Sequence, residues 1–140
     1  MIQPLLRVLL RYWLPVVLCC ATIVFWSGRS TFPFSLPSLG FARADLLWHF
    51  LEYLLLGLLT TRLFARGVGG LYTPGEALVV ATLFGLGFGA LDEVHQLSVP
   101  GRSVDLLDWL ADGIGTLAAV GAYALLRLRR PLLAGEREAT

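Results

Sequence analysis

Apolar residues along this chain gather into four long stretches, separated by short segments that are polar or rich in glycine and proline. The stretches cover residues from about 12–26, 45–64, 76–95 and 104–126. Each approaches the roughly 20 residues that an α-helix needs to cross the hydrocarbon core of a bilayer. The pattern predicts an all-α integral membrane protein, a bundle of four transmembrane helices. It forms one domain over residues 1–130, and residues 131–140 are expected to be a disordered tail.

The segments between the predicted spans contain residues that interrupt helices. Residues 27–44 hold two prolines and two glycines and are expected to be irregular. Residues 65–75 are rich in glycine, and residues 97–103 contain the turn signal Pro100-Gly101. The four spans are therefore joined by three loops, of which the last is short.

Composition supports a membrane protein and excludes other classes. Hydrophobic residues make up 56% of the chain, charged residues only 15%, and the mean hydropathy is +0.72. A soluble domain of this size carries more polar surface. The net charge of +1 gives no reason to expect a nucleic-acid partner. The two cysteines, Cys19 and Cys20, are adjacent in an apolar stretch and are interpreted as small apolar fillers.

The arginines predict the orientation of the spans. With both termini in the cytoplasm, the inner flanks carry seven arginines and the outer loops three. The inner set is Arg7, Arg11, Arg62, Arg66, Arg127, Arg129 and Arg130, and the outer set is Arg29, Arg43 and Arg102. This distribution follows the positive-inside rule and predicts that both termini are cytoplasmic.

Ionisable residues inside spans are costly and seldom face lipid, yet this chain has many in its last three spans. Helical spacing places each group on one face of its helix. The groups are Asp45, His49 and Glu52 in span two, Asp92 and Gln96 in span three, where Glu93 and His95 flank the shared stripe, and Asp105, Asp108 and Asp112 in span four. The predicted orientation brings all three groups to the outer end of the bundle, with Glu52 and Asp112 deepest.

We therefore expect a polar pocket open to the extracytoplasmic face, with Arg102 in the loop beside it. Spans two to four build this pocket, and span one mainly completes the bundle. Some members have structural alternatives. Asp45 and Asp105 could cap their helices, Arg102 could neutralise the acidic cluster, and His49 could be a hydrogen-bonding group between helices. The spacing Gly85-x-x-x-Gly89 indicates close packing of helices rather than chemistry.

Two stretches of the chain resemble a known family. Asp45-Leu-Leu-Trp-His49-Phe-Leu-Glu-Tyr53 resembles the second-span motif of the VanZ-like family. Asp92-Glu93-Val-His95-Gln96, followed by Pro100-Gly101-Arg102-Ser103 and Asp105-Leu-Leu-Asp108, resembles its most recognisable motif, and Gly115 fits a glycine that usually follows. The chain departs from the family at Leu46, where lysine is frequent, and at Asp112, where asparagine is frequent. Both departures make the pocket more acidic.

The resemblance implies a multi-pass protein of the bacterial cytoplasmic membrane. The family's founding member is associated with low-level resistance to the glycopeptide teicoplanin, which implies a role in the cell envelope. By family position, the matching motif residues are His49, Tyr53, Asp92, Glu93, Gln96, Arg102 and Asp108.

Three functions follow from these observations. The first is binding or modification of a lipid-linked cell-wall precursor or a phospholipid headgroup. In that hypothesis the acid–base cluster is His49, Glu52, Asp92 and Glu93, and the ligand-binding residues are Tyr53, Gln96, Arg102, Asp105, Asp108 and Asp112. A carboxylate-rich site with histidine also suits a divalent cation. The second function is a small proton- or ion-coupled transporter, which would need a homodimer or large movements, and the third is a non-catalytic structural or accessory subunit.

Overall fold

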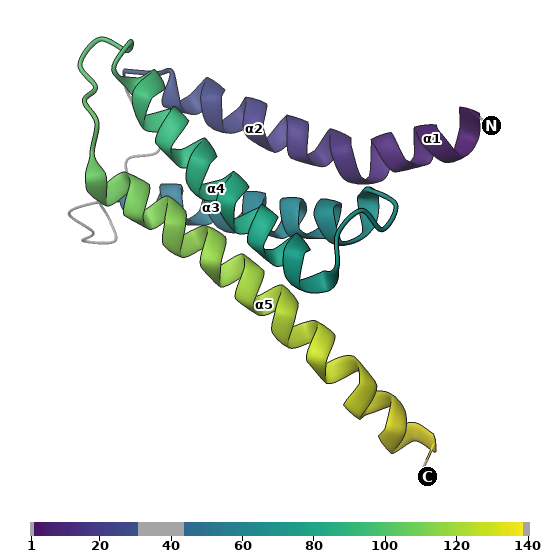
Figure 1. Ribbon diagram of the computed structural model, residues 1–140. Coiled ribbons are helices and arrows are strands. Elements are labelled where there is room, and N and C mark those ends of the chain that lie inside the picture. Colours follow the sequence, from purple (N-terminus) through teal and green to yellow (C-terminus); the bar gives the residue numbers. More distant parts are fainter. Residues whose placement is uncertain (1, 31–43, 139–140) are drawn as a thin grey trace.

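A computed structural model describes the backbone of residues 2–30 and 44–138, and the side chains of these residues as far as Arg127. In the described part every regular element is helical, as the apolar pattern predicts (Figure 1). The elements are α1 (Ile2–Val8), a π-helical segment (Leu9–Trp13), α2 (Leu14–Ser27), α3 (Ala44–Arg62), a second π-helical segment (Leu63–Gly67), α4 (Pro74–Gln96) and α5 (Leu106–Glu138).

Four of the resulting helical stretches are long and apolar enough to cross a membrane, which confirms the predicted fold class. They are Ile2–Ser27, Ala44–Gly67, Pro74–Gln96 and Leu106–Arg127. The first begins about ten residues earlier than predicted. Its early residues are also apolar, and Pro4 lies in the first turn, where no backbone N–H is needed.

Two predicted segments, the C-terminal tail and the loop between spans one and two, lie partly outside the described residues. α5 continues to Glu138, so it includes most of the segment expected to be a disordered tail, although side chains beyond Arg127 are not described. The expected irregular loop between spans one and two lies mainly in residues 31–43, outside the described residues.

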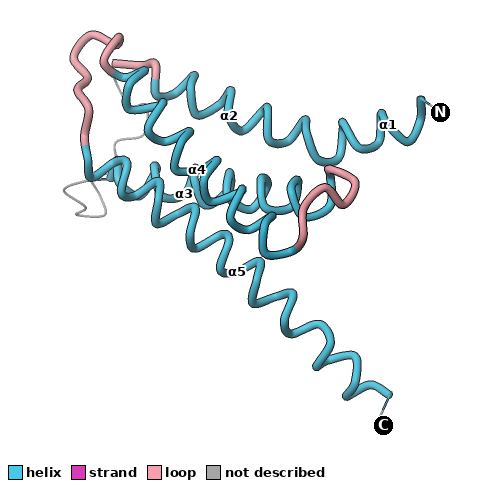
Figure 2. Tube along the Cα trace, in the orientation of Figure 1, coloured by secondary structure: helices cyan, strands magenta, loops and turns pink. Residues whose placement is uncertain are grey.

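The helices α3, α4 and α5 form the centre of the bundle, and the most extensive contact is between α3 and α5. α2 packs against α3 and α4. Figures 1 and 2 show both termini toward one end of the bundle, with the connection between α4 and α5 at the other. Termini at one end agree with an even number of crossings; the side of the membrane on which they lie stays a prediction.

Glycines bring α5 close to its neighbours. A Cβ at Gly57 would lie 2.8 Å from the Cβ of Ala119, and a Cβ at Gly115 would meet the carbonyl oxygen of Phe50. On α4, a Cβ at Gly85 would lie 2.5 Å from the side chain of Thr116. These contacts leave no room for larger residues, and they fix how α3, α4 and α5 are placed relative to one another.

α4 begins at the end of the bundle away from the connection between α4 and α5, and its first turn is capped in the ordinary way. The Thr73 hydroxyl accepts a hydrogen bond from the backbone N–H of Glu76 (3.3 Å), and the Glu76 carboxylate accepts one from the backbone N–H of Thr73 (2.8 Å). This capping box satisfies two backbone donors that the helix leaves free. Glu76 is fully exposed in this role and takes no part in the polar end of the bundle.

Candidate functional site

Six polar side chains meet inside the bundle near the connection between α4 and α5. Each is at most 5% exposed. We call them the polar cluster: His49, Asp92, Glu93, Gln96, Asp108 and Asp112. α3 supplies the histidine, the last two turns of α4 supply three members, and the first two turns of α5 supply two. Helices far apart in the chain therefore bring together the residues that spacing had placed on three separate faces.

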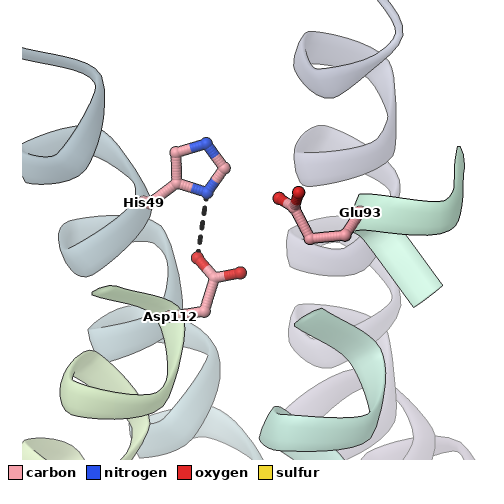
Figure 3. Close-up of side chains that lie close together, drawn as sticks. All are labelled: His49, Glu93 and Asp112. Carbon is pink, nitrogen blue, oxygen red and sulfur yellow. Dashed lines mark hydrogen bonds and ion pairs between the residues drawn. The ribbon is translucent and has the colours of Figure 1, made fainter. Parts of the chain in front are cut away.

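The centre of the polar cluster is a histidine–aspartate pair (Figure 3). His49 Nδ1 lies 2.9 Å from Asp112 Oδ1, and both side chains are buried. With Asp112 as a carboxylate, Nδ1 must be the donor, so a neutral ring keeps its lone pair on Nε2. His49 Nε2 lies 3.7 Å from Asp108 Oδ2, beyond hydrogen-bonding distance. The ring is thus held on one side and available for a proton or a ligand on the other.

Glu93 faces this pair from α4, as Figure 3 shows. Its Oε2 accepts a hydrogen bond from the backbone N–H of Asp105 at 2.7 Å, whereas its Oε1 is buried without a partner. One potential ligand atom from each of His49, Glu93 and Asp112 lies within 4.8 Å of the other two. Among the described residues, these three are the group whose geometry could hold a metal ion.

Much of the hydrogen-bonding capacity of this region is unused. Several buried atoms have no hydrogen-bond partner among the described residues. They include both carboxylate oxygens of Asp92, Oδ2 of Asp112, Oε1 of Glu93, Nε2 of Gln96 and the hydroxyl of Tyr53. A buried polar group without a partner costs about 1–3 kcal/mol, and most proteins contain only a few. Here they are concentrated in one place.

The connection between α4 and α5 closes over the polar cluster. Arg102 donates two hydrogen bonds to Oε1 of Gln96, from Nη2 at 2.8 Å and from Nε at 3.2 Å. Within this connection, the side chain of Val99 is buried, and Gly101 has the positive φ of 81° that its turn requires. The site expected as an open pocket is therefore covered in this structure, with Arg102 bonded to Gln96.

An apolar groove leads to the polar cluster from the side. It lies between α4 and α5, has a volume of about 230 Å³, and is lined by Ala90, Glu93, Val94, Val104, Leu106 and Trp109. Trp109 is held in place because its Nε1 donates to the carbonyl of Leu86 at 3.1 Å. Glu93 is the acidic residue of this lining, so the groove connects an apolar surface with the polar cluster.

One predicted site residue has a structural role, and two others lie at the edge of the polar cluster. Asp105 caps α5, because its Oδ1 accepts from the backbone N–H of Leu107 at 2.8 Å. Glu52 is half-buried on α3, close enough to His49 and Asp112 for their charges to interact. Tyr53 packs its ring in the apolar core, with its centroid 6.3 Å from that of Phe88, while its buried hydroxyl lies on the side of Asp92 and Asp112. The capping alternative for Asp105 is thus present in the structure.

Two hydroxyl residues belong to this region that the charge pattern did not reveal. Ser27, at the end of α2, is buried beside the Asp92 carboxylate. Thr116 is fully buried against Gly85 on the same face of α5 as Asp112, and its hydroxyl has no partner. Span one, expected mainly to complete the bundle, also contributes a polar group through Ser27. Helical spacing from Asp112 was the one available signal for Thr116.

Comparison with known proteins identifies the family. Residues 5–127, most of the chain, match the VanZ/LLP1 family. No curated protein and no solved structure matches the chain. The match includes nearly the whole of the four helices that are long and apolar enough to cross a membrane, and every member of the polar cluster. The chain therefore belongs to the VanZ/LLP1 family and is a multi-pass membrane protein of the VanZ type.

Proposed function

We propose that this protein binds the polar headgroup of a lipid or lipid-linked molecule of the cell envelope in its polar cluster. The observation that carries the proposal is the set of buried polar atoms without partners around the His49–Asp112 pair. The hydroxyl groups of a headgroup could donate to the unpartnered carboxylate oxygens, and its phosphate oxygens could accept from the Gln96 amide and the Tyr53 hydroxyl. Bound there, it would lie next to the free Nε2 of His49, a group suited to proton transfer.

The apolar groove supports a lipid rather than a free solute. It brings an apolar surface between α4 and α5 up to Glu93. A molecule with an acyl or prenyl tail could keep that tail in the groove while its headgroup enters the polar cluster from the side. A soluble ligand would gain nothing from this apolar lining.

A purely structural role fits the polar cluster less well. Polar groups that only hold helices together are expected to be paired with one another, because unpaired groups lower stability. Both oxygens of Asp92 and one oxygen each of Asp112 and Glu93 lack partners among the described residues. Buried carboxylates without partners are explained if an external ligand completes their hydrogen bonds.

A transporter is also less favoured. The other half of the bundle has a core of apolar residues such as Leu56 and Leu63. Its buried hydroxyls donate to their own helix, with Thr60 bonded to the carbonyl of Leu56 at 2.8 Å and Thr61 to that of Gly57 at 2.6 Å. These groups offer no evident polar path onward from the polar cluster.

We further propose that the polar cluster faces the extracytoplasmic side of a bacterial cytoplasmic membrane. The arginine distribution favours that orientation. A site there could meet a phospholipid headgroup or a lipid-linked wall precursor in the outer leaflet. Such binding would offer a physical basis for the association of the VanZ-like family with teicoplanin resistance.

Native mass spectrometry of the protein in detergent tests the proposal. We expect the wild type to retain one lipid, whose mass distinguishes a phospholipid from a polyprenyl phosphate. Asp112→Asn should reduce the lipid-bound fraction about tenfold, because the His49–Asp112 pair loses its charge. Glu76→Gln is the matched control, since Gln keeps the capping box at the opposite end of α4. A wild type without lipid, or equal retention by Asp112→Asn, would contradict the proposal.

A further inference from the structure

We infer that a divalent transition-metal cation of the Zn²⁺ or Mn²⁺ type binds between His49, Glu93 and Asp112. This inference rests on the proposed function, because the cation would lie in the same polar cluster and would contact the headgroup there. It assigns the free ring nitrogen of His49 to a metal rather than to a proton. It also supplies the positive charge that the polar cluster lacks.

The geometry of the three side chains suits one small cation. Their potential ligand atoms lie within 4.8 Å of one another, and Figure 3 shows the side chains of His49, Glu93 and Asp112 pointing toward a common space. Ligands bound at about 2.0–2.2 Å from one metal are separated by roughly 3–4 Å. The 2.9 Å hydrogen bond between His49 Nδ1 and Asp112 Oδ1 orients both side chains and leaves Nε2 and Oδ2 as the candidate ligand atoms beside Oε1 of Glu93, which small side-chain movements would bring together.

The two carboxylates are each held through one oxygen while the other is spare. Glu93 uses Oε2 to bind the backbone N–H of Asp105 and leaves Oε1 unpartnered. Asp112 uses Oδ1 toward His49 and leaves Oδ2 unpartnered, although it is completely buried. Ligands oriented by a second bond of this kind are typical of metal sites. The spare oxygens are therefore held in place as acceptors, and no described group donates a hydrogen bond to them.

The negative charge of the buried carboxylates also favours a bound cation. The three residues carry two carboxylates and no permanent positive charge, and the carboxylates of Asp92 and Asp108 are buried in the same cluster. Two described basic groups near the polar cluster are the half-buried His95 and Arg102, and Arg102 already donates to Gln96. Buried carboxylates without compensation are strongly unfavourable. A dication would offset the charges of Glu93 and Asp112.

The donor set selects the class of metal. One imidazole nitrogen with two carboxylates differs from the all-oxygen shells that Ca²⁺ and Mg²⁺ prefer. It matches mixed nitrogen and oxygen sites, which hold zinc or manganese. Three protein ligands leave at least one coordination position open. A phosphate oxygen of a headgroup could occupy that position, so the cation would give an anionic ligand a positive group besides Arg102.

Metal analysis of the purified protein tests the inference. After expression with added zinc and manganese, inductively coupled plasma mass spectrometry should find about one of these ions per wild-type chain. Glu93→Gln and Asp112→Asn should each lower the bound metal at least tenfold, whereas the control Glu76→Gln should keep the wild-type content. Wild-type content at background level, or unchanged content in both site variants, would overturn the inference.

A second measurement protects the test against variants that fold poorly. Wild-type protein stripped with EDTA should melt at a higher temperature when Zn²⁺ or Mn²⁺ is added, because a ligand bound only to the folded state stabilises it. The absence of such a shift for both ions would overturn the inference. The stripped protein should also lose its lipid. Stripped protein that kept its lipid would refute the cation's role and leave the proposed function standing. A protein that bound metal but no lipid would refute the proposed function instead.

Discussion

Gly89 is the residue on which the position of Asp112 depends. A Cβ at this position would lie 2.9 Å from Oδ2 of Asp112 and 3.3 Å from its Cβ. The fully buried aspartate therefore occupies space that any larger residue at position 89 would need. Gly85 and Gly89 on α4 therefore affect the positions of side chains in the site as well as the packing of the helices.

We predict that Gly89→Ala lowers metal and lipid retention about tenfold while the protein still folds. The added methyl group must displace the Asp112 carboxylate by a few tenths of an ångström, which disturbs its bond to His49. Gly87→Ala is the matched control, because nothing lies within 4 Å of a Cβ at position 87. Retention can be measured by native mass spectrometry. Equal retention by the two variants would show that Asp112 is not constrained by Gly89.

At the scale of elements, the approach of α5 to α3 decides whether His49 can reach Asp112. Gly115 lies against the carbonyl of Phe50, the residue next to His49. Since α3 and α5 share the most extensive contact in the bundle, a change in their separation affects both stability and the site.

Gly115→Ala should lower the melting temperature by several degrees, because overpacking between helices costs about 1–3 kcal/mol. It should also abolish metal retention, since α3 and α5 would separate beside His49. Gly121→Ala, on the same helix with nothing within 4 Å of its Cβ, should change neither property. Thermal unfolding monitored by circular dichroism provides the comparison. A Gly115→Ala variant as stable as Gly121→Ala would contradict this description of the α3–α5 contact.

The connection between α4 and α5 depends on Arg102 for its closed position. We expect Arg102→Leu to increase amide hydrogen exchange in residues 97–105 about tenfold, because two hydrogen bonds to Gln96 are lost. Arg66→Leu removes an exposed arginine from the opposite end of the bundle and serves as the control. Unchanged exchange in Arg102→Leu would mean that other contacts keep the connection closed.

At the scale of the whole molecule, the orientation in the membrane can be tested directly. In a background with Cys19→Ala and Cys20→Ala, Ser103→Cys should react with a membrane-impermeant maleimide in intact cells. Leu71→Cys, in the connection before α4, should react only after the cells are permeabilised. The excess of arginines on the flanks near the termini predicts this result. The reverse pattern would place the polar cluster on the cytoplasmic side.

The sequence predicted the fold and the composition of the polar end but not its detailed contacts. Periodicity placed His49 on one face of α3, and Asp108 and Asp112 on one face of α5. Which atoms meet depends on the register between helices, and this is set by local contacts such as those of Gly57 and Gly115. Ser27 was not found because a hydroxyl in an apolar stretch carries no charge signal. The closed position of residues 97–105 depends on the bonds of Arg102, which spacing alone does not determine.

The melting temperature of Asp92→Asn tests most directly whether the polar cluster is a ligand site or a structural device. Asp92 is 3% exposed, and neither of its oxygens has a hydrogen-bond partner among the described residues. In lipid- and metal-free protein, removing this charge should leave the melting temperature unchanged or raise it by a few degrees, because an unpaired buried charge is lost. Lipid retention should fall in the same variant. A melting temperature several degrees below that of the wild type would show that Asp92 stabilises the bundle, and would contradict the binding site.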